Sequence, residues 1–145
     1  MKHSFDVAAA PGHLIRRAHQ ISVAVFHTHL ACADVTPVQF AILNALMDSP
    51  GVDQTTLATR VAFDPATSGS VIGRLVSKGW VARRSDDVDR RRKLLVLTPE
   101  GQQALTGMLC AVAEVQAEIL SPLTAPEQLQ FMHLLSLLVS RHEAV

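Results

Sequence analysis

Apolar residues recur every three or four positions along most of the chain, which predicts a mostly helical fold. The pattern predicts a first helix over residues 12–33, a second from Thr36 to Met47, a long helix that starts at Thr98-Pro99, and a final helix from Thr124 to His142. Thr36 and Thr124 each precede a Gln or Glu by three positions, which is the capping-box pattern of a helix start.

Two shorter helices are predicted in tandem between residues 53 and 78. Asp53 is placed to cap the first, which continues to Val61. Asp64-Pro65 starts the second, and Gly79 ends it. The first two turns of the second helix carry small hydroxyl residues and no large apolar ones. A helix with such a polar N-terminal half, placed behind another short helix, is typical of a helix-turn-helix that enters the major groove of DNA.

A basic hairpin follows this pair of helices. Strand patterns at residues 80–83 and 93–97 flank a loop in which arginines surround a short acidic run. A two-stranded ribbon with an arginine-rich tip beside a helix-turn-helix is a winged helix, and its tip can reach phosphates or the narrow minor groove. The predicted fold class is therefore mostly α with a small β-wing. A winged helix-turn-helix lobe at residues 36–98 is inserted between the parts of a helical dimerisation lobe at residues 12–33 and 99–143 of a single subunit.

The final helix is apolar on almost every side. A fully buried core helix would explain this pattern. A terminal helix of this kind needs cover on two sides, however, and a small subunit cannot supply that alone. We therefore expect a homodimer whose interface is built from the first and the last two helices.

Charge is distributed unevenly along the 145 residues, although the formal net charge is zero. Residues 60–93 contain nine basic and four acidic residues, and the rest of the chain carries the opposite excess. One basic lobe on a neutral protein is expected of a local DNA-binding surface. A solvated basic face is the alternative explanation.

Enzymatic motifs are missing from the sequence. It contains no phosphate-binding glycine loop, no Gly-x-Ser-x-Gly and no His-Glu-x-x-His, so we expect neither an enzyme nor a cofactor. No apolar run approaches the roughly 18 residues of a membrane span, so we expect a cytoplasmic protein with no membrane partner.

Histidines and cysteines leave two further sensing mechanisms open. His27 and His29 would point about 200° apart on a helix and cannot bind one metal ion together, so a metal-responsive regulator would need ligands from elsewhere. Two cysteines are too few for a disulfide framework. We expect Cys110, within an apolar run, to be a small buried hydrophobe, and Cys32 has no adjacent cation to activate it. Redox sensing stays an alternative.

Three motifs resemble those of the MarR family of regulators. Asp89-Arg90-Arg91 followed by residues 95–101 resembles the family's wing signature: Asp-x-Arg, a strand, then Leu-Thr-x-x-Gly. Residues 36–43 resemble its Thr-x-x-Gln/Glu-x-x-x-Leu helix, and residues 75–81 resemble its Leu-x-x-x-Gly junction before two hydrophobic residues. The resemblance covers about residues 14–142 and implies a homodimeric, DNA-binding transcriptional regulator.

Candidate DNA contacts lie on the second short helix and the hairpin. The resemblance implies that Arg91 enters the minor groove and that Asp89 holds it in place. Two-fold symmetry would then require an inverted-repeat operator with half-sites about 10 bp apart. An interaction module that kept the winged-helix shape without binding DNA is the competing class. The expected contacts from the helix are Pro65 (to a thymine methyl), Thr67, Ser68, Ser70 and Arg74. In the hairpin, Arg90 and Arg92 are expected to contact phosphates, and Arg83, Arg84 and Lys93 are expected to add to the positive electrostatic potential.

The start of the first helix carries a candidate effector site. Arg16 with Gln20, and His13 with Arg17, are i,i+4 pairs. An arginine that binds a carboxylate, with a histidine or glutamine orienting ring substituents, suits a small aromatic acid. These residues could instead be solvated or pair with Glu114 or Glu118. The expected ligand-binding residues are His13, Arg16, Arg17, His19 and Gln20, with Phe40 and Leu43 as walls.

The family resemblance favours the effector reading. Residues 14–21 resemble the MarR branch that senses aromatic-acid catabolites, including repressors of nicotinate degradation. This implies a repressor released by a hydroxylated pyridine or benzene carboxylate. A phenolic antibiotic or an oxidant remains an alternative effector.

Overall fold

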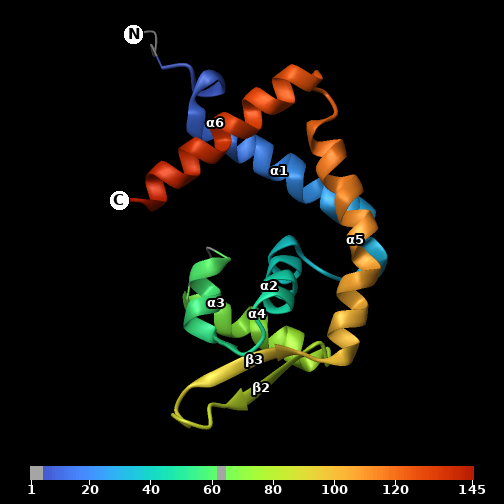
Figure 1. Cartoon of the computed structure of the whole chain (residues 1–145). Coiled ribbons are helices and arrows are strands. Elements are labelled where there is room, and N and C mark those ends of the chain that lie inside the picture. Colours follow the sequence, from blue (N-terminus) through green and yellow to red (C-terminus); the bar gives the residue numbers. More distant parts are fainter. Residues whose placement is uncertain (1–4, 62–64) are drawn as a thin grey trace. The chain divides into compact units, whose positions relative to one another are not determined.

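Helices make up most of the chain, with one small sheet (Figure 1). The structure is a computed structural model that describes residues 5–61 and 65–145, with the backbone alone for residues 65 and 66. This mostly helical chain with a small antiparallel sheet confirms the predicted fold class. The helices are α1 (Pro11–Leu30), α2 (Pro37–Asp48), α3 (Gln54–Arg60), α4 (Pro65–Ser77), α5 (Pro99–Leu120) and α6 (Ala125–Glu143), with short 3-10 turns at Val7–Ala9 and Ala31–Ala33. The strands are β1 (Val52–Asp53), β2 (Val81–Ser85) and β3 (Lys93–Leu97).

Two units make up the chain. Unit 1 contains the chain up to Val25 together with Ala113–Val145, and unit 2 is the continuous segment Phe26–Val112. Both α1 and α5 therefore contribute residues to each unit. Unit 2 begins ten residues before the predicted winged-helix lobe because the end of α1 belongs to it: Phe26 is buried, and its ring lies 6.5 Å from the ring of Phe40.

The sheet lies within unit 2 and has the strand order β1-β3-β2, with both pairings antiparallel. Leu95 of β3 pairs with Val52 on one side and with Arg83 on the other. Its side chain is fully buried, and each such side chain contributes about 1.5–3 kcal/mol to folding. The other large, fully buried residues of unit 2 are Ile42, Leu43 and Leu46 of α2, Leu57 of α3, Ile72 and Leu75 of α4, Val81 of β2 and Leu105 of α5.

Side-chain caps fix where several helices begin. The Thr36 hydroxyl accepts from the Gln39 N–H (3.2 Å), and the Gln39 side chain accepts from the Thr36 N–H (3.1 Å), which confirms the predicted capping box of α2. Thr124 and Glu127 form the second predicted capping box at α6. At the end of α4, Gly79 adopts the left-handed φ of +80° expected of a helix-ending glycine. The predicted cap Asp64 lies outside the described residues.

Helix α6 in unit 1 has no buried residue. Leu129 is 75% exposed, and Leu134 is 56% exposed. The alternative of a fully buried core helix therefore does not hold within one chain. Among the described residues no single helix is long and apolar enough to cross a membrane, although two sharply bent helix pairs reach that length and composition together.

Candidate functional site

Helix α4 presents a polar face, as its sequence pattern predicted. Ile72 and Leu75 are fully buried on one side, whereas Thr67, Ser70 and Arg74 are exposed. Two predicted contacts need separate comment. Ser68 is only 2% exposed, so its side chain packs within unit 2 instead of lying on the exposed face. The Pro65 side chain lies outside the described part of the chain. The surface that α4 offers to a groove is thus narrower than the sequence suggested.

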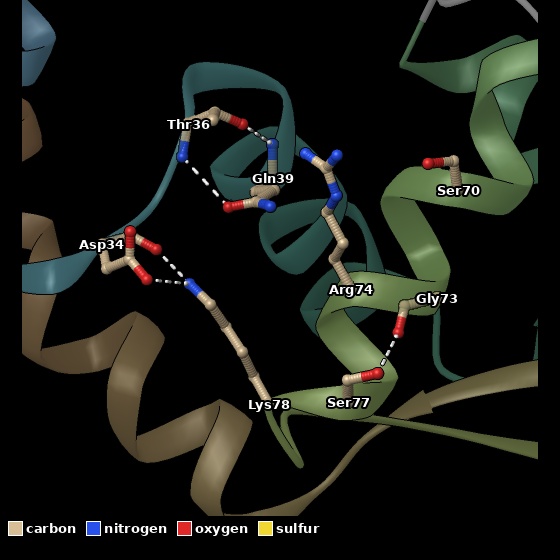
Figure 2. Close-up of a pocket in the computed structure, with 8 residues that line it drawn as sticks. All are labelled: Asp34, Thr36, Gln39, Ser70, Gly73, Arg74, Ser77 and Lys78. Carbon is tan, nitrogen blue, oxygen red and sulfur yellow. Dashed lines mark hydrogen bonds and ion pairs between the residues drawn. The ribbon is translucent and has the colours of Figure 1, made fainter.

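A polar hollow of about 630 Å³ lies between α4 and the start of α2 (Figure 2). On one side, Lys78 is held in place: its ammonium donates to the Asp34 carbonyl, lies 3.7 Å from the Asp34 carboxylate and stacks 4.6 Å from the centre of the Trp80 ring. Arg74 extends into the hollow toward Gln39. Of these two cations, Lys78 fixes the end of α4, and Arg74 is the exposed one.

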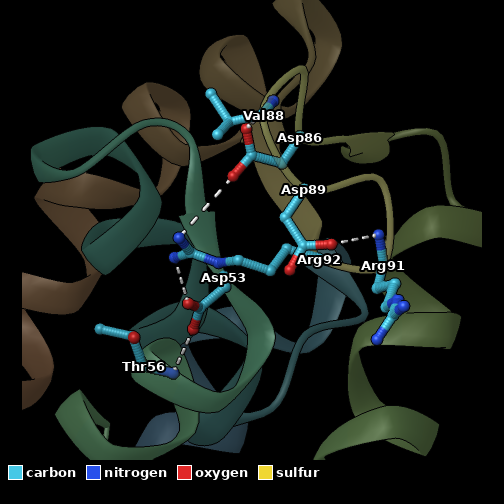
Figure 3. A network of polar contacts seen from close by, with 7 residues as sticks. All are labelled: Asp53, Thr56, Asp86, Val88, Asp89, Arg91 and Arg92. Atoms are coloured by element: carbon cyan, nitrogen blue, oxygen red, sulfur yellow. Dashed lines mark hydrogen bonds and ion pairs between the residues drawn. The ribbon is translucent and has the colours of Figure 1, made fainter.

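The tip of the β2–β3 hairpin is ordered by two aspartates (Figure 3). Asp86 accepts a hydrogen bond from the Val88 N–H (3.0 Å), and Asp89 accepts one from the Arg91 N–H (3.1 Å). The family resemblance implied that Asp89 holds Arg91. In this structure it does so through the backbone amide of Arg91, and the guanidinium of Arg91 stays exposed.

One arginine of the tip differs from its neighbours. Arg83, Arg84, Arg90 and Arg91 are exposed, and Lys93 donates to the Ser85 hydroxyl (3.2 Å). The Arg92 side chain is also exposed, at 53%, but it extends back to the start of α3. Its Nη2 lies 2.5 Å from the Asp53 carboxylate, and its Nη1 lies 3.7 Å from the Asp86 carboxylate. Sequence reasoning assigned Arg92 to phosphates and missed this network, because it joins residues that are 39 positions apart.

Asp53 has two roles in this network. It is the predicted N-cap of α3 and accepts a hydrogen bond from the Thr56 N–H (2.7 Å). Hydrogen bonds from Thr56, and then from Arg92, lower the pKa of Asp53 to about 2. Because this pKa is below its ordinary value, the stabilisation is fully present above about pH 4 and is lost as the pH falls toward 2. The ion pair with Arg92 therefore persists at neutral pH.

A second hollow, of about 380 Å³, lies where α3, α4 and the hairpin meet. Gln54 and Thr55 line it from α3, and Arg91 and Lys93 line it from the hairpin. The recognition-helix candidate, the start of α3 and the basic ribbon therefore border one surface of unit 2. Polar donors and cations on a helix beside a basic hairpin can bind DNA phosphates and base edges.

The candidate effector residues pair differently from the prediction. Arg16 hydrogen-bonds to His13 (3.1 Å), and Arg17 donates to Gln20 (3.1 Å), so the pairs are i,i+3, and the predicted i,i+4 partners are wrong. His19 lines an apolar groove of about 670 Å³ within unit 1. The other lining residues are Leu14, Ile15, Ala18 and Ser22 of α1, Gln116, Ile119 and Leu120 of α5, and Phe131, Met132 and Leu135 of α6.

The two predicted walls belong to unit 2. Leu43 is fully buried in the core there and offers no surface to a ligand, which corrects its assignment. Phe40 is half-buried. The prediction failed for Leu43 because helical spacing alone does not tell which apolar residue points to the centre of a core.

The structure also tests the predictions for the two cysteines and for a metal site. Both Cys32 and Cys110 are free and exposed, so the expected burial of Cys110 is wrong. The buried side of α5 contains Met108 and Val112, and a residue two positions after Met108 points to the opposite side of the helix. In the residues that the structure describes, no three His, Cys, Asp or Glu side chains converge on a possible metal position.

Comparison with known proteins shows which protein family the chain resembles. The MarR family model matches residues 33–92. The transcriptional regulator HosA of Escherichia coli O127:H6 is 33% identical over 84% of this chain and 89% of its own length. BpsR of Bordetella bronchiseptica, whose DNA binding is regulated by 6-hydroxynicotinic acid, has a similar fold (TM-score 0.89) and is 29% identical over 94% of this chain and 98% of its own.

A further solved structure shows a relative with a ligand bound. PcaV of Streptomyces coelicolor, solved in complex with its natural ligand, is 36% identical over 95% of this chain and 97% of its own, with a TM-score of 0.88. The identity and coverage shared with HosA and PcaV, together with the winged-helix geometry, decide the assignment. The chain belongs to the MarR family of DNA-binding transcriptional regulators.

Proposed function

We propose that this chain is a homodimeric repressor that binds an inverted-repeat operator and is released by a small aromatic carboxylate. The observation that carries the proposal is the shared surface of unit 2. There the exposed polar face of α4, with Thr67, Ser70 and Arg74, accompanies an ordered tip whose Arg91 is exposed. A helix of this kind reads a major groove while the tip reaches the adjacent backbone or minor groove.

Homodimerisation follows from the apolar surface of α6. Leu134 and Leu138 are 56% and 45% exposed and do not belong to the lining of the apolar groove. Large apolar side chains that are exposed together on one helix of a small protein mark an interaction surface. A second copy of the chain is the partner that makes a two-fold symmetric reader, with half-sites about 10 bp apart.

An acidic effector is favoured by the partners of Arg16 and Arg17. Both guanidinium groups hydrogen-bond to side chains that carry no negative charge, His13 and Gln20, so they remain suited to bind a carboxylate. One relative supports the same class of ligand, since 6-hydroxynicotinic acid regulates DNA binding by BpsR, and PcaV shows that a relative of this fold binds a natural ligand. The effector would favour a spacing of the recognition helices that no longer matches the operator.

The first experiment tests sequence-specific binding. We expect selection from random DNA duplexes to yield an inverted repeat, and we expect the complex on that duplex to contain two copies of the chain. Gel shift and sedimentation measure the two results. Equal affinity for the selected duplex and a scrambled duplex at moderate salt would contradict the repressor and favour a protein-interaction module. A single bound copy would contradict the dimer.

The second experiment tests release. We expect 6-hydroxynicotinic acid or a related hydroxylated ring carboxylate to lower operator affinity by roughly 5–150-fold, the usual range of allosteric coupling. The amide of the same ring, which lacks the negative charge, is the matched control and should release little DNA. The double variant R16A/R17A should bind operator but fail to respond. Release that persists in this variant would show that neither arginine binds the effector.

A further inference from the structure

Arg92 links two ordered turns of unit 2 (Figure 3). Its guanidinium lies between the carboxylates of Asp53, at the start of α3, and Asp86, at the base of the hairpin tip, at 2.5 Å and 3.7 Å. Each carboxylate also accepts a backbone N–H, from Thr56 in one case and Val88 in the other. Because both acceptors are already fixed in their own turns, the arginine joins two preformed pieces of structure.

The tip extends beyond the paired part of the two strands. The β2–β3 pairing ends at Ser85 and Lys93, so the seven residues between them, from Asp86 to Arg92, lie beyond the ladder. Turn hydrogen bonds fix the shape of the tip, for example from the Asp86 N–H to the Arg92 carbonyl (3.1 Å), but they do not tie it to the helices. A two-stranded ribbon alone is only marginally stable in water. The contact of Arg92 with Asp53 supplies a direct link from the tip to α3.

Arg92 differs from the neighbouring Arg91 in how its charge is paired. Both side chains are exposed and line the hollow shared with α3 and α4, but the positive charge of Arg92 is met by two carboxylates, whereas Asp89 binds Arg91 through its backbone N–H. A cation that is already paired with carboxylates of the protein releases few counterions from DNA, because it does not replace them at a phosphate. The same pairing also neutralises Asp53, whose bare carboxylate would repel a DNA backbone at this surface.

We propose that Arg92 is a positioning residue, which fixes the wing against the start of α3 and thereby places Arg91 relative to α4, and that it does not bind a phosphate. This inference rests on the proposed DNA-binding function. It assigns different roles to two adjacent arginines that the sequence pattern treats alike.

The test uses the full-length chain with Arg92→Gln, Asp53→Asn and the double variant. Asparagine caps a helix about as well as aspartate, so D53N keeps the start of α3 and removes only the charge that holds Arg92. Specific DNA affinity is measured over a range of salt concentrations, and thermal melts check that each variant is folded. Arg90→Gln is the matched control, because it removes an exposed cation from the same tip.

We expect R92Q and D53N each to lower operator affinity by roughly two- to fivefold, the range of a partly exposed ion pair. The double variant should lose no more than the worse single variant, because both remove the same contact. The slope of log K against log salt should stay unchanged in R92Q, should flatten by about one unit in R90Q, and should steepen in D53N, where Arg92 is freed.

Two results would overturn the proposal. The first is a slope in R92Q that flattens by about one unit, as in R90Q, with independent effects of the two substitutions; Arg92 would then be a phosphate contact. The second needs no DNA. Hydrogen exchange of the Val88 and Arg91 amides is compared in free wild-type and R92Q protein. Equal protection in the two proteins would show that Arg92 does not hold the tip in place. If the chain showed no specific DNA binding, only the proposed function would be contradicted, because the exchange measurement still tests whether Arg92 holds the tip.

Discussion

Replacing Gly101 by alanine is expected to destabilise the protein by about 3 kcal/mol, the upper end of the cost of overpacking. A Cβ at this position would lie 2.0 Å from the carbonyl oxygen of Trp80, 2.8 Å from its carbonyl carbon and 2.9 Å from its Cα. These are backbone atoms, and the same carbonyl accepts a hydrogen bond from the Thr98 N–H (3.0 Å). The contact therefore cannot be relieved by rotating a side chain.

The expected destabilisation by G101A is opposite in sign to the effect that helix propensity alone would predict. Gly101 lies in the first turns of α5, and alanine is favoured over glycine in a helix by about 1 kcal/mol. Gly107 in the same helix is the matched control, because a Cβ there meets nothing within 4 Å, so Gly107→Ala should be neutral or stabilising. Urea denaturation measures both. If G101A were as stable as wild type, the close approach of α5 to Trp80 would be wrong.

Arg91→Ala is expected to lower operator affinity by on the order of 10–100-fold, which corresponds to the roughly 1–3 kcal/mol carried by one well-oriented arginine contact. The guanidinium is exposed at the tip, and the Arg91 N–H is bound by Asp89, so the side chain is presented from an ordered turn. Removing it should also flatten the salt slope by about one unit. Fluorescence anisotropy with a labelled operator at several salt concentrations measures both quantities.

Arg141→Ala controls for loss of charge alone. Arg141 lies in the last turn of α6, in unit 1, and is not one of the proposed DNA-binding residues, so its removal should change neither affinity nor slope appreciably. Equal losses in R91A and R141A would mean that net charge, and not a placed contact, supports binding. An R91A variant that binds operator like wild type would remove Arg91 from the wing contact.

Local signals in the sequence predicted the helices well. Thr36, Asp53 and Thr124 each form the predicted cap, because capping depends on residues only three positions apart. The end of α4 was likewise set by Gly79. The first helix was predicted to reach residue 33, and it instead ends at Leu30 and continues as a 3-10 turn, since no local residue distinguishes these two kinds of turn.

Features that depend on distant residues were not predicted. Strand β1 has two residues, too few to show alternation, and it exists because Val52 and Asp53 pair with Leu95 and Leu94. The Arg92–Asp53 ion pair depends on that same pairing, which brings the start of α3 to the base of the hairpin. Arg92 lies in a run of three arginines that look equivalent in sequence, so its partner required the fold.

The division of the chain has a consequence for the order in which the protein is made. Unit 2 is one continuous segment, Phe26–Val112, and it can complete its core as soon as that segment has left the ribosome. Unit 1 needs two segments of the chain: most of α1 is synthesised first, but its partners in unit 1, the end of α5 and all of α6, follow only after all of unit 2. At 5–20 residues per second this delay is on the order of 10 s. During that time Leu14 and Ile15 have no α6 with which to form the apolar groove, so the nascent chain passes through a stage in which this apolar side of α1 is uncovered.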